Sequence, residues 1–87
     1  MDYKSKLIEV VNNPTKYFKN KHAIDLCKEY RNVIVKDSMI LQPKHYKKLY
    51  IAIMAGDTKG RTLRAIKQTI YADYMKQNNA YSDNLNK

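Results

Sequence analysis

Apolar residues at spacings of three and four constrain the fold of this 87-residue chain more than any other feature of its sequence. That spacing gathers apolar side chains on one face of an α-helix. The segments that carry it are 2–12, 21–36, the stretch from Pro43 to Gly56, and the stretch from Asp57 or Thr58 to about Gln77. The β-branched run 33–35 could also form a strand, but one isolated strand has no pairing partner. The sequence therefore predicts an all-α fold, a small bundle of about four helices.

Proline and glycine mark the ends of these segments. Pro14 excludes the preceding residue from the helical region and can open a further turn that Asn13 caps, whereas 15–20 stays ambiguous. Pro43 opens the third helix, and Gly56 supplies the left-handed residue that a helix C-terminus favours. These positions predict breaks between the helices.

The second half of the chain is predicted to form a helical hairpin at 43–77. Asp57 or Thr58 can cap its second helix, and Gly60 falls in the first turn of that helix. We expect residues 1–77 to form a single helical domain and the polar residues 78–87 to be a frayed tail.

The same periodicity predicts the core. Cys27 falls on a buried stripe, where it behaves as a small hydrophobe. We also expect Met39, Ile40 and Leu41, in the connection after the second helix, to pack against the core. The tyrosines expected in the core are Tyr30, Tyr46, Tyr50 and Tyr74. Tyr71 is instead the candidate for an exposed ring that stacks on a base or a sugar.

Several classes of protein are disfavoured by the composition. A single cysteine forms no disulfide framework, and no apolar run reaches the roughly 18 residues of a membrane span. The N-terminal residues lack a signal-peptide apolar region, so we expect a cytoplasmic protein. His22 and His45 have no cysteine or carboxylate at metal-ligand spacing, and we expect both on the surface. No catalytic set can be assembled, so we expect no enzyme, no metal and no cofactor.

The chain is strongly basic, with 17 Lys and Arg against eight Asp and Glu, which gives a net charge of +9. Such an excess favours a polyanionic partner, nucleic acid before an anionic membrane surface. The abundant Lys, Asn, Ile and Tyr have AT-rich codons, so part of the lysine excess could be genomic. That composition fits an AT-rich bacterium, or a phage or plasmid protein.

The fourth helix carries a basic face opposite its apolar face. The apolar residues are Leu63, Ile66, Ile70 and Tyr74. At 100° per residue, the opposite face gathers Arg61, Arg64, Gln68 and Tyr71. Lys67 flanks this face, and Lys59 precedes it in the turn. The arginines matter because a guanidinium group can make two hydrogen bonds to a phosphate or a guanine.

The stretch 51–67 resembles a helix-turn-helix DNA reader. In that family a small residue in the first helix is followed four positions later by the glycine of the turn, and Ala52 and Gly56 have this spacing. The resemblance implies that the second helix lies in the major groove. The residues that would then touch bases are Lys59, Arg61, Thr62, Arg64 and Lys67.

This stretch also departs from the family pattern. Asp57 stands where an apolar residue is usual, and Leu63 and Ile66 come one position late. An ordinary helical hairpin explains the same residues.

Together these features predict a small basic nucleic-acid-binding protein, most directly a DNA-binding one, such as a regulator or replication accessory factor of a mobile element. The candidate binding residues are Lys44, Lys47, Lys48, Lys59, Arg61, Thr62, Arg64, Lys67, Gln68 and Tyr71. A sequence-specific reader would form a homodimer, because one helix spans few base pairs. The alternative is a protein-binding module, for example a small inhibitor, an immunity-type protein or an accessory subunit, that docks on an acidic partner.

Overall fold

The computed structural model describes residues 2–56 and 60–86, in which every regular element is a helix. The helices are α1 (Tyr3–Asn12), α2 (Pro14–Tyr17), α3 (Lys21–Lys36), α4 (Pro43–Met54) and α5 (Arg61–Asn86). The predicted small all-α bundle is confirmed. The helix beyond the predicted four is α2, a single turn in the stretch that the sequence left ambiguous.

Local chemistry explains where these helices begin. The Asp2 carboxylate accepts a hydrogen bond from the Lys4 N–H at 3.1 Å, and the Asn20 side chain accepts one from the His22 N–H at 2.8 Å. Each bond satisfies an amide that lacks a partner at a helix N-terminus. Pro14 opens α2, and α4 likewise begins with a proline, in the position where a missing N–H costs nothing.

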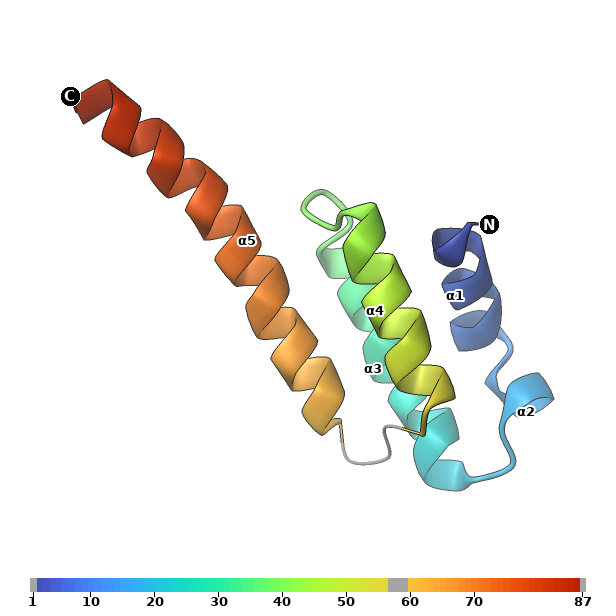
Figure 1. Cartoon of the computed structure of the whole chain (residues 1–87). Helices are drawn as coiled ribbons and strands as arrows, with labels where there is room; N and C mark the ends of the chain where they lie inside the picture. The colour runs from blue at the N-terminus through green and yellow to red at the C-terminus, as the bar shows by residue number, and fades with distance from the viewer. Residues whose placement is uncertain (1, 57–59, 87) are drawn as a thin grey trace.

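A single core joins the helices. On one side α1 packs against α3 and α4, and α5 packs against α4 on the other side, leaning away from the bundle toward its C-terminus (Figure 1). The buried residues of this core are Leu7, Val10, Val11, Leu26, Cys27, Tyr30, Val33, Ile34, Tyr46, Leu49, Ala52, Ile53, Leu63, Ile66 and Ile70. The predicted burial of Cys27, Tyr30 and Tyr46 is confirmed, and Tyr50 is partly buried.

The hairpin of α4 and α5 has an antiparallel register. His45, near the start of α4, contacts Asp73 in the middle of α5, while Ala52 and Ile66 line one groove nearer the turn. The two helices therefore stay side by side over about two turns. A helix-turn-helix unit differs in this respect, because its two helices cross at about 90–120°. The arrangement is that of an ordinary helical hairpin, the other interpretation of the sequence.

Two residues predicted to be buried are exposed. Met39 is 94% exposed, because the turn after α3 directs Ile40 and Leu41 against the core instead. Tyr74 is 42% exposed, although it continues the stripe of Ile70. The reason is visible in Figure 1, in which the C-terminal half of α5 extends beyond the other helices.

The bounds of α5 also differ from those expected. Gly60 precedes the helix with φ of +72°, rather than lying in its first turn, and the helix continues past Gln77 to Asn86. No proline or glycine follows Gly60 in the sequence to end it. The frayed tail at 78–87 stays a prediction. The caps predicted at Asp57 or Thr58 lie outside the described residues.

Candidate nucleic-acid interface

The predicted binding residues of α4 lie on its exposed side. Lys44, Lys47 and Lys48 all point away from the core, but two of them have neighbours. The Lys44 ammonium lies 3.3 Å from the Asp73 carboxylate, and the Lys47 ammonium lies 5.7 Å from the centroid of the Tyr3 ring. Lys44 is thus a paired cation, and Lys48 carries charge at the edge of the hairpin.

The predicted basic face of α5 divides between two surfaces. Arg61 and Gln68 are exposed and point away from the bundle, opposite the buried Ile70. Thr62 is also exposed and lies toward α4. The other residues of this predicted face, Arg64, Lys67 and Tyr71, lie toward α3. Lys59 lies outside the described residues.

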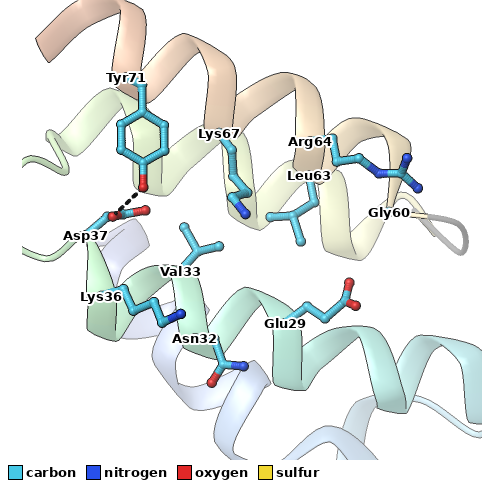
Figure 2. A pocket seen from close by; sticks show the side chains of 10 residues that line it. All are labelled: Glu29, Asn32, Val33, Lys36, Asp37, Gly60, Leu63, Arg64, Lys67 and Tyr71. Atoms are coloured by element: carbon cyan, nitrogen blue, oxygen red, sulfur yellow. Dashed lines mark hydrogen bonds between the residues drawn. The ribbon is translucent and has the colours of Figure 1, made fainter. Parts of the chain in front are cut away.

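A groove between α3 and α5, here called the α3–α5 groove, gathers the other predicted residues (Figure 2). It has a volume of about 460 Å³. From α5 and its start it is lined by Gly60, Leu63, Arg64, Lys67 and Tyr71, and from α3 and the residue after it by Glu29, Asn32, Val33, Lys36 and Asp37. The sequence predicted the α5 side of this groove and missed the α3 side, because nothing in a sequence states which helix packs beside which.

The α3–α5 groove has an apolar floor and charged walls. Val33 and Leu63 are buried at its base. Lys67 extends toward the middle of the groove from α5, Lys36 extends along α3, and Arg64 lies toward the Gly60 end (Figure 2). The carboxylates at its ends are Glu29 and Asp37. Three cations therefore face two acids, with Lys67 in the middle of the groove and Arg64 at the same end as Glu29.

Tyr71 stands at one end of the α3–α5 groove with its hydroxyl held in place. The hydroxyl donates a hydrogen bond of 2.9 Å to Asp37 Oδ1, and this bond to the carboxylate raises the pKa of Tyr71. The side chain is still 46% exposed, which confirms the predicted exposure of this ring. The ring is accessible to a partner and fixed in orientation.

His45 corrects the prediction of a surface histidine, because it is fully buried. Its Nδ1 accepts a hydrogen bond of 3.0 Å from the Gln42 N–H, and its Nε2 lies 2.8 Å from Asp73 Oδ2. Since a carboxylate only accepts, the proton lies on Nε2. This hydrogen bond, followed by the one from Lys44, lowers the pKa of Asp73. A signal was present in the sequence, because His45, Leu49 and Ala52 have helical spacing.

A second groove separates α4 from α5 near the turn and is mostly apolar. It has a volume of about 480 Å³. The residues that line it are Lys48, Ile51, Ala52, Ala55, Gly56, Thr62 and Ile66. Ile51 is 52% exposed here, which leaves apolar surface open to solvent beside a cation.

The described part of the chain offers neither a set of metal ligands nor a membrane-spanning helix. Residues 2–56 and 60–76 contain no cluster of three or more His, Cys, Asp or Glu side chains that could hold a metal ion. None of the helices described there has the length and apolar character that crossing a bilayer requires.

Comparison of the chain with protein-family models, with curated proteins and with solved structures returned no match. Any assignment of function therefore starts from the residues and their geometry.

Proposed function

We propose that this chain binds nucleic acid, most directly DNA, through α5 and the surfaces beside it. The observation that carries the proposal is the convergence of Arg64 and Lys67 of α5 with Lys36 of α3 in one groove that also presents the ring of Tyr71. Cations position phosphates, and an exposed aromatic ring stacks on bases.

The charge of the whole chain supports the same proposal. With a net charge of +9, the protein attracts polyanions from a distance, and specific contacts then fix the orientation. Arg61 and Gln68 extend the polar surface of α5 on the side that faces solvent, and Lys48 lies across the hairpin. The contacts expected are mainly to the phosphate backbone.

The test is an affinity measurement with a variant that removes the α5 cations. In Arg61→Ala/Arg64→Ala/Lys67→Ala, the affinity for a duplex of mixed sequence should fall by at least tenfold, since contacts to charged groups are each worth about 1.5–3 kcal/mol. The matched control removes three cations elsewhere, Lys19→Ala/Lys21→Ala/Arg31→Ala. Equal losses of affinity in the two variants would show that binding depends on net charge alone and not on the cations of α5.

One observation favours a second function, binding to an acidic protein. The groove between α4 and α5 exposes Ile51 beside Lys48, a combination that suits an apolar side chain flanked by a carboxylate. In this case Ile51→Asp should abolish capture of one acidic protein from a nuclease-treated lysate and leave binding of nucleic acid unchanged. Capture that is equal with the wild type and Ile51→Asp would exclude this groove.

A further inference from the structure

The α3–α5 groove is elongated, because its two helices run in the same direction. At one end Gly60 lies beside Leu26 and Glu29, and at the other Tyr71 is bonded to Asp37. The eleven helical residues from Arg61 to Tyr71 correspond to about 17 Å of helix. A groove of that length can hold more than one nucleotide of a nucleic-acid strand.

The walls of the groove place positive charge on both sides of such a strand. Lys36 belongs to α3 and Lys67 to α5, and both side chains line the groove; Lys67 extends from α5 toward α3, whereas Lys36 extends along α3 in the direction of Asn32 (Figure 2). Neither has an ion pair with a described residue. The carboxylates of Glu29 and Asp37 lie toward the ends, so a phosphate is favoured in the middle of the groove.

The ring of Tyr71 distinguishes between kinds of nucleic acid. It is half exposed, and its hydroxyl is anchored, so its orientation is set before a ligand arrives. Paired bases in a duplex have their faces covered by their neighbours, whereas an unpaired base can stack on an aromatic side chain. The ring can therefore stack on an unpaired base of a single strand, whereas it adds little to the binding of a duplex.

We infer that the α3–α5 groove binds a single-stranded nucleic-acid segment, with its phosphates between Lys36 and Lys67 and one base stacked on Tyr71. This inference rests on the proposed function and narrows it. It assigns to Lys36, a residue outside the hairpin, the same phosphate-binding role as Lys67.

The experiment compares a short single-stranded oligonucleotide with a blunt duplex of the same length. Tyr71→Leu removes the aromatic face, whereas Tyr71→Phe keeps the face and removes only the hydrogen bond to Asp37. Tyr17→Leu is the matched control, because it removes a comparably exposed ring from α2. We expect Tyr71→Leu to weaken single-strand binding about tenfold. Tyr71→Phe and Tyr17→Leu should each stay within about threefold of the wild type, and duplex binding should change little in all three.

A second variant tests the phosphate position. Lys36→Gln should make the slope of log K against log salt for the single strand less steep by about 0.7, the value for one lost phosphate contact. Its melting temperature should stay that of the wild type, because Lys36 is exposed.

The outcomes separate the two proposals. A wild-type protein that binds neither oligonucleotide overturns both the function and this inference. A protein that binds nucleic acid with Tyr71→Leu at wild-type affinity for the single strand overturns the inference alone. So does an equal loss of single-strand and duplex binding in Tyr71→Leu, since the ring then does not distinguish a single strand from a duplex.

Discussion

Individual side chains decide how α5 is held on the bundle. His45 of α4 bonds to Asp73 of α5 through Nε2, and through Nδ1 to the amide that begins α4. Both ring nitrogens are satisfied, and the His45 side chain has no exposure to solvent. The residue that the sequence suggested as a surface histidine is therefore a fixed link between the two helices of the hairpin.

Replacing His45 is expected to destabilise the fold strongly. His45→Ala leaves a cavity and an unpaired Gln42 amide, which should cost about 2–3 kcal/mol of the free energy of unfolding. His22→Ala is the control, because that histidine is exposed, and should stay within about 0.5 kcal/mol. Urea denaturation of both variants measures the difference. Similar unfolding midpoints would show that the buried contacts of His45 contribute nothing.

The same contact gives the stability a pH dependence. The hydrogen bond from His45, followed by that from Lys44, lowers the pKa of Asp73 below its ordinary value of 3.8. A carboxyl with a lowered pKa in the folded state contributes stability that is present above the unfolded value and lost as the pH falls through the folded value. Acid unfolding followed by circular dichroism should therefore show a smaller loss of stability below about pH 4 in Asp73→Asn than in the wild type. Identical acid profiles would contradict this link.

At the level of elements, the helices follow local rules and their packing does not. The bounds of α1, α3 and α4 agree with the sequence because Asp2, Asn20 and Pro43 act on their own neighbours. The exposure of Met39 and the burial of His45 depend instead on what lies beside them in space. The sequence indicated Arg64 and Tyr71. For the same reason, however, it could not indicate that α3 completes their groove.

The turn between α4 and α5 begins at a glycine in a left-handed conformation. Gly56 has φ of +89°, and a Cβ there would meet no atom within 4 Å, so only the backbone opposes a side chain. Gly56→Ala should cost about 1 kcal/mol of the free energy of unfolding, and Gly56→Asn less, because asparagine tolerates this region better. Thermal melting of the two variants compares them. Alanine that is tolerated as well as asparagine would contradict the backbone argument.

For the whole molecule, the net charge of +9 and the shape of the bundle act together. Three helices, α1, α3 and α4, form a compact base, and α5 lies beside it and extends beyond it (Figure 1). The cations of α5 thus lie along a helix that is held at one end and open to solvent on its outer side. We therefore expect this surface to contact an extended polyanion, as proposed above, and not a small ligand.

The most direct test of nucleic-acid binding is the dependence of affinity on salt. For the wild type and a duplex, log K should fall linearly and steeply with log salt, because each neutralised phosphate releases condensed counterions and adds about 0.9 to the slope. Arg61→Ala/Arg64→Ala/Lys67→Ala should reduce the slope by about 2 to 3. A wild-type slope near zero, or a slope unchanged in the variant, would contradict phosphate binding by α5.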